Sequence, residues 1–327
     1  MAPTLSICIP TLNRCDFLCG ALQSIFNADW NHTRIEVCIS NNASEHDYTA
    51  FEQILASAPP GLQVRYQLQP QRLPLDENMF AVRKMATADF IYFLGDDDYF
   101  LDGQPPLLLE LIDQKSPDLA IFNGRLVDGS NQVIGAHFTL PATVYPDALA
   151  AFRDLRDKGM FGAVLVKSAH LKDEHFKALF GTSHGYGCYW FSLLDDRTRQ
   201  QPARIMVPDF PLVALRMAAK SYSLLDVYYR QIPYEIAVYR RHLPPGIPQR
   251  ANLGFEKAYF RKISSLLFLM QMRLNGVPID DIENIFPSFY QRHAWKIWLA
   301  NLFVRSGAYD LLKRVYKRTF GSRVNRR

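Results

Sequence analysis

The sequence predicts an α/β fold with a mixed, mainly parallel sheet flanked by helices and a helical extension at the C-terminal end. Up to about residue 125, short apolar runs alternate with helical patterns, which is typical of a parallel, doubly wound sheet. Hydrophobic residues make up 48% of the 327 residues, so a sizeable core can be buried. We expect a domain over residues 1–245, with halves at 1–125 and 126–245, and a helical extension over residues 246–327.

Strands and helices alternate from the N-terminus. The apolar run from Leu5 to Ile9 predicts a strand that Pro10 ends, and apolar residues at helical spacing then predict a helix up to Ile25. The same two patterns predict further strands at 35–39, 64–68, 91–94, 118–122 and 162–166, and further helices at 48–57, 78–88, 107–112 and 148–156. Turn signals make residues 126–146 extended and hairpin-prone. Ligands of parallel sheets bind at the carboxyl ends of the strands, so the loops there are the candidate site.

The C-terminal part is helical and ends in a basic segment. Beyond a proline-rich stretch at 244–248 we expect helices at 255–274, 279–286 and 289–303. The segment Leu311–Phe320 has the pattern of an amphipathic helix, and seven Lys and Arg residues fall between Lys313 and Arg327. A basic amphipathic helix can lie in an anionic membrane surface. The alternative is a solvated helix with a frayed tail. No known nucleic-acid-binding module accompanies the basic cluster, so we expect no nucleic acid partner.

Cysteine usage and hydropathy indicate the cellular compartment in which we expect the protein. The five cysteines have spacings that suit neither a zinc site nor a disulfide framework, so we expect reduced thiols. We identify no signal peptide, and no segment reaches the roughly 20 apolar residues of a membrane span. These observations predict a cytoplasmic protein, with peripheral binding to the inner face of the cytoplasmic membrane as one interpretation of its basic end.

Three consecutive acids, Asp96, Asp97 and Asp98, end the apolar run at residues 91–94. Adjacent carboxylates repel one another unless a cation neutralises them, and Mg²⁺ often bridges protein carboxylates to phosphates. In extended chain Asp96 and Asp98 point the same way, so one can hold a metal while the other holds a neighbouring group of the ligand. A polar turn is the alternative interpretation. We call these three residues the triple acid.

Four segments, taken in order, carry a resemblance to a known family. They are Ile9-Pro-Thr-Leu-Asn-Arg14, Ile39-Ser-Asn-Asn-Ala-Ser44, Asn78 before a helix, and Phe93-Leu-Gly-Asp-Asp-Asp98. Together they resemble the inverting family 2 glycosyltransferases with the GT-A fold, and most of all the bacterial branch of abequosyltransferase-like enzymes. The resemblance implies transfer of a sugar from a nucleoside diphosphate sugar to a hydroxyl of a bacterial surface glycan, such as O-antigen or capsule, on a glycan or lipid-linked glycan acceptor.

The resemblance implies that the first two loops hold the base and ribose of the donor. The residues carried over are Pro10, Thr11, Asn13 and Arg14 on one side and Asn41 on the other. The family usually has Asp at the position of Asn41, where it pairs with a uracil N–H. Because an amide can both donate and accept, UDP, CDP and dTDP all stay open.

The resemblance also implies where the diphosphate and the metal bind. It gives Asp98 the metal, Mn²⁺ or Mg²⁺, and gives Asp96 the ribose or sugar, while Asp97 either contacts the donor sugar or is solvated. Lys84 and Arg216 are candidate phosphate contacts, with surface solvation as the alternative for Lys84. His242, in a Tyr239-Arg-Arg-His segment similar to one of the family, is a candidate metal ligand or simply opens the proline-rich stretch. The metal would offset the charge that develops on the leaving diphosphate.

An inverting transferase needs a general base that deprotonates the attacking hydroxyl. In much of the family this is an acid at the start of a helix well after the triple acid, but no Glu-Asp pair occurs there in this sequence. We favour His184, because an imidazole titrates near neutral pH, and then Asp195. The alternative for His184 is a hydrogen-bonding role in its loop.

Two other functions are weighed against this one. A sugar-phosphate nucleotidyltransferase would need a glycine-rich phosphate loop after the first strand, and Pro10-Thr-Leu-Asn-Arg14 contains no glycine. A catalytically inactive scaffold that binds a nucleotide sugar or a glycan at the membrane stays open, because the general base is not identified.

Overall fold

A computed structural model describes residues 2–195, 201–217, 223–244 and 246–306. The chain forms two compact units. Unit 1 comprises Met1–Ala219 with Val238–Ala251, and unit 2 comprises Lys220–Ala237 with Asn252–Arg327. The predicted basic helix Leu311–Phe320 and the cations from Lys313 to Arg327 lie outside the described residues. All five cysteines are unpaired and buried.

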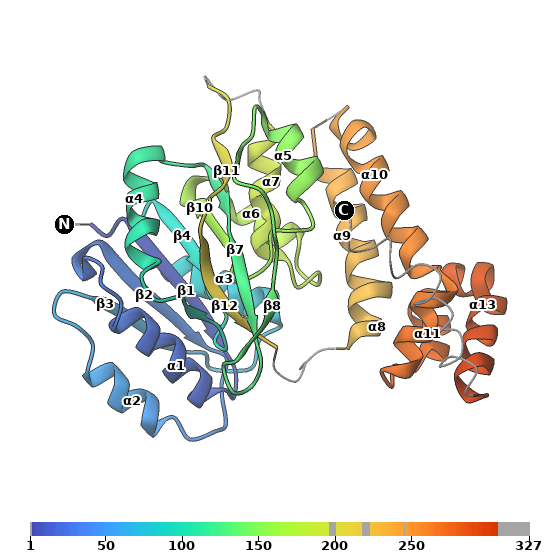
Figure 1. Ribbon diagram of the computed structural model, residues 1–327, viewed down its shortest axis with the longest axis horizontal. Coiled ribbons are helices and arrows are strands. Elements are labelled where there is room, and N and C mark those ends of the chain that lie inside the picture. The colour runs from blue at the N-terminus through green and yellow to red at the C-terminus, as the bar shows by residue number, and fades with distance from the viewer. Residues whose placement is uncertain (1, 196–200, 218–222, 245, 307–327) are drawn as a thin grey trace. The chain divides into compact units, whose positions relative to one another are not determined.

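The core of unit 1 is an eight-stranded sheet with the order β3-β2-β1-β4-β10-β6-β11-β9. Four parallel neighbours, coloured blue to cyan in Figure 1, are β3 (Gln63–Leu68), β2 (Ile35–Asn41), β1 (Leu5–Thr11) and β4 (Phe90–Phe93). The rest are β10 (Val164–Lys167), β6 (Leu119–Ile121), β11 (Ile205–Val207) and β9 (Thr143–Val144). Because β10 runs antiparallel to both β4 and β6, the sheet is mixed but mainly parallel, which confirms the predicted fold class.

Helices of unit 1 cover both faces of this sheet, and the alternation of side chains along each strand supplies apolar residues to both. The helices are α1 (Cys15–Phe26), α2 (Thr49–Ala56), α3 (Leu75–Met85), α4 (Pro105–Lys115), α5 (Ala148–Leu155), α6 (Asp173–Ala178) and α7 (Tyr189–Leu193). Successive strand residues point to opposite faces. In β4, Ile91 and Phe93 join a core that includes residues of α3, α5 and α7. Phe90 and Tyr92 join a second core that includes residues of α1 and α4.

A smaller sheet of unit 1 has the order β5-β12-β7-β8. Its strands are β5 (Tyr99–Phe100), β12 (Pro211–Arg216), β7 (Asn123–Val127) and β8 (Val133–Ala136). The hairpin of β7 and β8 confirms the extended chain predicted after residue 126. The sequence did not predict β12, which pairs with β5 and so brings Arg216 beside the triple acid.

Unit 2 is helical, as the C-terminal pattern predicts. Its elements are α8 (Leu224–Asp226), a π-helical turn (Val227–Gln231), the first part of α9 (Ile232–His242), most of α10 (Ile247–Ile263), α11 (Leu266–Leu274), α12 (Ile282–Ile285) and α13 (Pro287–Arg305). The helix predicted at 255–274 is interrupted, because Ser265 accepts the N–H of Phe268 and so caps a new helix. In the part of the chain that the structure describes, no helix is both long and apolar enough to cross a bilayer.

Candidate active site

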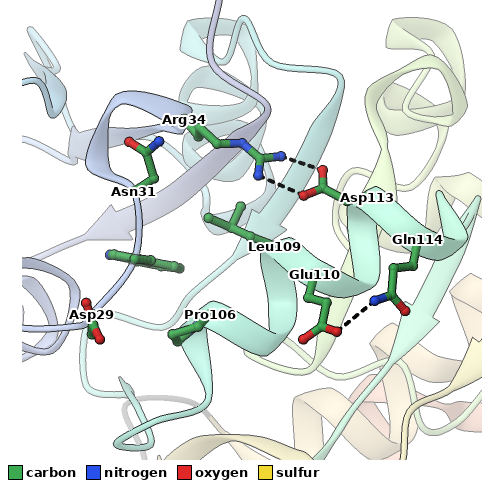
Figure 2. Close-up of a pocket in the computed structure, with 9 residues that line it drawn as sticks. Asp29, Asn31, Arg34, Pro106, Leu109, Glu110, Asp113 and Gln114 are labelled. Carbon is green, nitrogen blue, oxygen red and sulfur yellow. Dashed lines mark hydrogen bonds and ion pairs between the residues drawn. The ribbon is translucent and has the colours of Figure 1, made fainter.

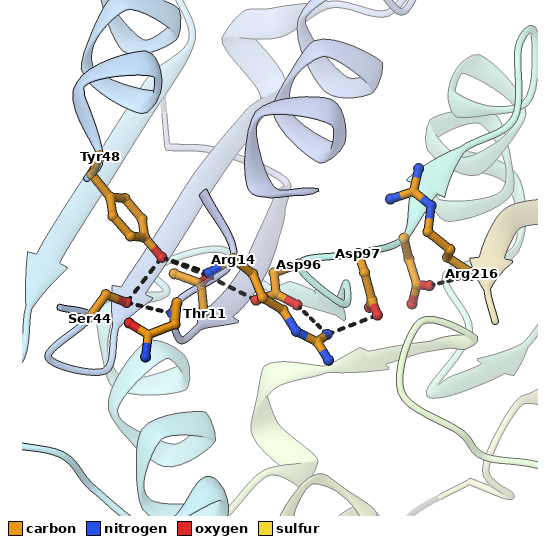
Figure 3. A network of polar contacts seen from close by, with 9 residues as sticks. Thr11, Arg14, Ser44, Tyr48, Asp96, Asp97 and Arg216 are labelled. Atoms are coloured by element: carbon orange, nitrogen blue, oxygen red, sulfur yellow. Dashed lines mark hydrogen bonds and ion pairs between the residues drawn. The ribbon is translucent and has the colours of Figure 1, made fainter. Parts of the chain in front are cut away.

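Loops from three strand ends meet at one edge of the large sheet. Thr11, the last residue of β1, is in register with Asn41, the last residue of β2, and β1 also pairs in parallel with β4. The chain leaving β4 therefore carries Asp96 to the same edge. Thr11 Oγ1 donates to Asp96 Oδ2 at 2.8 Å, as Figure 3 shows. This is the convergence that the sequence predicts from the carboxyl ends of parallel strands.

Arg14 is the cation of this network. Its Nη1 lies 3.2 Å from Asp96 Oδ1 and 2.8 Å from Asp97 Oδ2. Burial by itself would lower the pKa of Arg14, but the charges of Asp96 and Asp97 outweigh it and raise the pKa. The guanidinium therefore compensates part of the charge of the triple acid, through its ion pairs with Asp96 and Asp97.

Asn13 ties the first loop to the second. Its φ of 55° puts the backbone in the left-handed region, which asparagine tolerates better than most residues. Its backbone N–H donates to Ser44 Oγ at 2.8 Å, and its side-chain Oδ1 accepts the N–H of Glu45 at 2.9 Å. Asn13 thus shapes the loop pair and fixes the position from which Arg14 reaches the acids.

Tyr48 joins the same network and was not identified from the sequence. Its hydroxyl accepts from Ser44 Oγ at 3.0 Å and lies 3.3 Å from Thr11 Oγ1 (Figure 3). The backbone N–H of Arg14 approaches the same hydroxyl at 3.4 Å. The only signal in the sequence is an aromatic residue directly before α2.

Asn41 is 2% exposed, and both ends of its amide are engaged. Its Nδ2 donates to the hydroxyl of Tyr66 at 2.9 Å, and its Oδ1 accepts the N–H of Ser44 at 2.9 Å. Tyr66, in contrast, is 39% exposed. With its oxygen accepting from Asn41, the Tyr66 hydroxyl keeps its own hydrogen to donate. The polar group that Asn41 presents at this edge is therefore the hydroxyl of Tyr66.

Asp98 sits in a cradle formed by two glycines. A Cβ atom on Gly95 would lie 2.5 Å from Asp98 Oδ2, and one on Gly162 would lie 2.8 Å from the same oxygen. Oδ1 of Asp98 accepts the backbone N–H of Arg216 at 3.0 Å. Burial, and then the neighbouring charge of Asp97, raise the pKa of Asp98 well above its usual range. Such a carboxylate gains from a nearby cation.

The residues present fit a divalent cation that completes its ligands from a substrate. Burial raises the pKa of Asp96 to about 6 even though Arg14 opposes it, so a second buried carboxylate also lacks full compensation. Among the described residues, no three His, Cys, Asp or Glu side chains converge into a metal site of their own. Mg²⁺ and Mn²⁺ suit oxygen donors, and Mg²⁺ commonly uses one or two carboxylates together with substrate phosphates.

Arg216 offers an unused donor next to this carboxylate pair. Its guanidinium stacks over Phe17 at 4.9 Å and Tyr99 at 5.6 Å from the ring centroids. One nitrogen, Nη2, donates to Asn131 at 2.6 Å, whereas the buried Nε has no hydrogen-bond partner in the described part of the chain. A buried N–H without a partner is costly unless a ligand satisfies it. The side chain is thus suited to a phosphate oxygen.

The loop that carries His184 is held by a buried acid, Asp76, which the sequence analysis missed. Asp76 lies on the first turn of α3 and accepts three backbone N–H groups, from Gly181 at 2.9 Å, Ser183 at 2.8 Å and Gly185 at 3.0 Å. Burial raises the pKa of Asp76, although these three hydrogen bonds oppose the rise. Two of the three bonded residues flank His184, so Asp76 fixes the backbone on both sides of it.

Aromatic packing places this loop against the end of β4. The ring of Tyr186 lies 5.9 Å from that of Phe93 and 5.4 Å from that of Phe161. The His184 ring packs edge-on against Tyr186, with the ring centroids 6.2 Å apart. Since Phe93 is the last residue of β4, His184 belongs to a loop anchored at the strand that leads into the triple acid.

Comparisons with known proteins identify a family for this chain. Residues 6–168 match the model described as glycosyl transferase family 2. The chain belongs to this family. Abequosyltransferase RfbV of Salmonella typhimurium is 29% identical over 112 residues, which are 34% of this chain and 33% of that protein. The chain thus matches about a third of the length of this relative.

Solved structures give the same fold for this family 2 member. S. aureus TarS 1–349 in complex with UDP-GlcNAc has a TM-score of 0.55 and 14% identity, with 93% of this chain and 92% of that chain covered. A longer structure of S. aureus TarS has a TM-score of 0.59 and 15% identity, with 92% of this chain and 55% of that chain covered. At these identities the likeness concerns the fold alone.

Three predicted site residues of this family 2 member lie in other surroundings. Lys84 forms an ion pair with Asp173 at 3.0 Å, which joins α3 to α6. Asp195 follows α7 and lies near His175, where burial lowers the pKa of the imidazole and the charge of Asp195 opposes that effect. His242 is exposed at the end of α9, with its ring centroid 5.7 Å from that of Phe191. Among the described contacts, neither Lys84 nor His242 touches the triple acid.

A hollow of about 400 Å³ lies elsewhere in unit 1, between the chain before β2 and helix α4 (Figure 2). None of the predicted site residues lines it. Its Arg34 is already paired with Asp113 through two hydrogen bonds of 2.8 and 2.6 Å. Glu110 likewise accepts from Gln114. With these polar groups satisfied by one another, we assign the hollow no chemistry.

Proposed function

We propose that this family 2 member transfers a sugar, with inversion at the anomeric carbon, from a nucleoside diphosphate sugar to a hydroxyl of a bacterial surface glycan. The observation that carries the proposal is the largely buried triple acid, which follows β4 at the edge where β1 and β2 also end, with Asp98 in its glycine cradle. The match to an abequosyltransferase over part of its length supports a surface-glycan acceptor.

The donor would bind along the loops that Arg14, Asn13 and Tyr48 hold together. Its base would lie toward Asn41 and Tyr66, and its diphosphate toward the Nε of Arg216, which has no hydrogen-bond partner among the described residues. A structure of similar fold was solved with UDP-GlcNAc, which supports a uridine nucleotide as the first candidate. CDP and dTDP remain the alternatives, because Asn41 stands where the family usually has Asp.

Asp98, assisted by Asp96, would hold Mn²⁺ or Mg²⁺. When bound, the ion would offset the negative charge of the leaving diphosphate. The chain contributes the rest through its own groups. Arg14 stays charged and keeps Asp96 and Asp97 in place. The side chain of Arg216 would orient a phosphate, and the backbone N–H of Arg216 holds the carboxylate of Asp98.

His184 would accept the proton of the attacking hydroxyl, with Asp195 as the second candidate. An imidazole is suited to this role near neutral pH. Asp76 supports the assignment indirectly, because it fixes the backbone on both sides of His184 through hydrogen bonds to Ser183 and Gly185. A general base must be held within hydrogen-bond reach of the proton it takes, and a rigid loop serves that need.

A panel of ligands tests the proposal. UDP, CDP, dTDP and GDP are added with and without Mn²⁺ to wild type, to Asp98→Asn and to the exposed control Asp102→Asn, and thermal unfolding is followed. A ligand at 100 times its Kd stabilises the folded state by about 2.7 kcal/mol. We expect one diphosphate to stabilise wild type and the control in the presence of metal, and to leave Asp98→Asn unchanged.

Turnover separates an enzyme from a scaffold that only binds the nucleotide. Release of the nucleoside diphosphate from the matching nucleotide sugar, measured with a surface-glycan acceptor, should require both Asp98 and His184. Stabilisation without any release would favour the inactive scaffold. If none of the four nucleotides stabilises the protein at millimolar concentration, the assignment of the triple acid to a diphosphate is wrong.

A further inference from the structure

The outward face of α13, in unit 2, carries tryptophans where a surface helix normally carries polar residues. Trp295 is 60% exposed, Trp298 63% and Leu302 47%. Their spacing of three and four residues puts them along one face of the helix. The opposite face, with Phe289, Ile297 and Ala300, is buried in the core of unit 2. We call Trp295, Trp298 and Leu302 the tryptophan band.

A basic pocket lies beside the N-terminal end of the same helix. It has a volume of about 360 Å³, and its lining combines three phenylalanines, Phe260, Phe286 and Phe289, with Arg261, Arg292, His293 and the hydroxyls of Ser264 and Ser288. No acidic side chain is among the described residues that line it. Burial, and then the charges of Lys296 and Arg292, lower the pKa of His293, so the positive charge of the pocket comes from its two arginines. The pocket therefore offers donors and positive charge suited to a phosphate.

The tryptophan band and the basic pocket adjoin. Lys296 Nζ donates to the backbone carbonyl of Ser264 at 2.9 Å and lies 5.5 Å from the ring centroid of Trp295. Arg292, which lines the pocket, is three residues before Trp295 and so lies next to it on the helix surface. Cations thus surround one end of an exposed apolar face, and Arg305 follows its other end.

Charge identifies the occupant of this face. Helix α13 (Pro287–Arg305) carries Arg292, Lys296 and Arg305 and no acid, and the sequence after it adds seven Lys and Arg residues and one acid, Asp310. The surface of a protein partner carries charges of both signs. An anionic bilayer instead offers negative headgroups above an apolar interior, which matches basic residues beside exposed aromatic ones. Tryptophan is enriched at the membrane–water interface, and basic amphipathic helices lie in that plane. Scattered exposed apolar residues need no explanation, but a contiguous band of this kind does.

We propose that the outer face of α13 docks on the surface of an anionic phospholipid bilayer. Trp295, Trp298 and Leu302 enter the boundary between headgroups and acyl chains, and the pocket of Arg261, Arg292 and His293 receives a headgroup phosphate. This inference goes beyond the proposed transfer reaction and does not depend on it. It gives the membrane contact a folded surface in addition to the basic segment from Lys313 to Arg327.

The tryptophans themselves report the binding. The chain has four, and the other two, Trp30 and Trp190, are 7% and 1% exposed. Full-length protein is mixed with vesicles of phosphatidylglycerol and phosphatidylcholine, or of phosphatidylcholine alone, and emission is recorded. We expect a blue shift with the anionic vesicles, and quenching by lipids brominated near the headgroup end of the acyl chains. With phosphatidylcholine alone the shift should be much smaller.

Variants separate the face from the basic tail. Trp295→Ser with Trp298→Ser should lower partition into anionic vesicles at least tenfold in flotation, and Arg261→Gln with Arg292→Gln should weaken it in the same direction. Val144→Ser, which removes an apolar side chain 72% exposed in unit 1, is the matched control and should bind as wild type. Asp98→Asn should also bind vesicles normally, so failure of the transfer proposal stays distinguishable.

Three outcomes would overturn the proposal. In the first, the double tryptophan variant floats with anionic vesicles as wild type does, whereas neutralising Lys313, Arg314, Lys317 and Arg318 abolishes flotation. The basic tail alone would then bind the membrane. Another is a wild-type dimer that the tryptophan substitutions convert to a monomer, since the face would then join two copies. The third is an absence of any emission change with anionic vesicles. Unchanged thermal unfolding of each variant is required for every comparison.

Discussion

A Cβ atom on Gly162 would lie 2.8 Å from Oδ2 of Asp98, so the carboxylate occupies space that only a glycine leaves open. Gly162 also has a φ of 84°, in the left-handed region that glycine adopts at no steric cost. The same carboxylate has its other oxygen on the backbone N–H of Arg216. Gly162 and Arg216, which are distant in sequence from Asp98 and from each other, therefore both restrict this carboxylate, as a pre-organised ligand-binding group requires.

Replacing Gly162 by Ala should damage ligand binding more than stability. Strain at a positive φ costs a non-glycine residue about 1 kcal/mol. Gly103→Ala is the matched control, because Gly103 has a φ of 72° and nothing lies within 4 Å of its added Cβ. We expect Gly162→Ala to lose more stability than Gly103→Ala, because its Cβ would also lie 2.7 Å from Leu215 Cδ2. Only Gly162→Ala should lose Mn²⁺-dependent nucleotide binding, by at least tenfold in calorimetry. Equal binding by the two variants would contradict the cradle.

The titration of Asp96 predicts a pH dependence of the unliganded protein. Its folded pKa is about 6, above the ordinary value of 3.8, so the folded state holds this proton more tightly than the unfolded state does. The contribution to stability is present below about pH 4 and is lost as the pH rises toward 6. A separation of about two pKa units corresponds to about 3 kcal/mol.

Other carboxylates titrate in the same range, so the variant Asp96→Asn is needed to isolate this effect. The free energy of unfolding in urea is measured at pH 4 and pH 6.5 for wild type, Asp96→Asn and the exposed control Asp102→Asn. Wild type and Asp102→Asn should lose the same stability between pH 4 and pH 6.5. Asp96→Asn lacks the contribution of Asp96, so it should lose less, and its stability relative to the other two proteins should be higher at pH 6.5 than at pH 4. A gain at the lower pH instead would reverse the sign and refute the prediction.

Asp76→Asn should impair turnover while leaving nucleotide binding intact. An amide cannot accept all three backbone N–H groups that Asp76 accepts, and an unsatisfied buried donor costs about 1–3 kcal/mol. The loop around His184 should loosen as a result. Glu77→Gln, at the neighbouring position, is the control, since Glu77 makes no such bond among the described contacts. We expect a lower Tm and a lower kcat for Asp76→Asn, with an unchanged Kd for the nucleoside diphosphate. A proportional loss of nucleotide binding would instead indicate a general structural defect.

The sequence predicts the part of the site that depends on strand order. Parallel strands end at a common edge, so the polar residues after Ile9, after Ile39 and after Leu94 are expected together from the strand pattern alone. Thr11, Arg14 and Asp96 do meet there. The alternating residues of β4 also follow from the pleat, which assigns each to a core on one face of the sheet.

Contacts between residues distant in the chain leave no periodic pattern in the sequence from which they could be predicted. Gly181 donates to Asp76 across 105 residues of sequence, and no periodicity links the two. The strand β12, which delivers Arg216, was missed because Pro208 and Pro211 interrupt its apolar run and proline normally argues against a sheet interior. Tyr48 was missed because a single aromatic residue before a helix has no distinctive spacing. These parts of the site come from tertiary packing rather than from local pattern.

The stacked guanidinium of Arg216 leads to the last prediction. Because its backbone N–H holds Asp98, any side-chain substitution keeps that bond and tests the guanidinium alone. Arg216→Lys retains a positive charge but loses the planar stack over Phe17 and Tyr99, and it loses the Nε–H that has no partner in the described part of the chain. We expect about tenfold weaker binding of the diphosphate with Mn²⁺ in calorimetry, equivalent to about 1.4 kcal/mol. Arg125→Lys, at an exposed position of β7, should bind as wild type; if Arg216→Lys does so too, the guanidinium serves packing and not the phosphate.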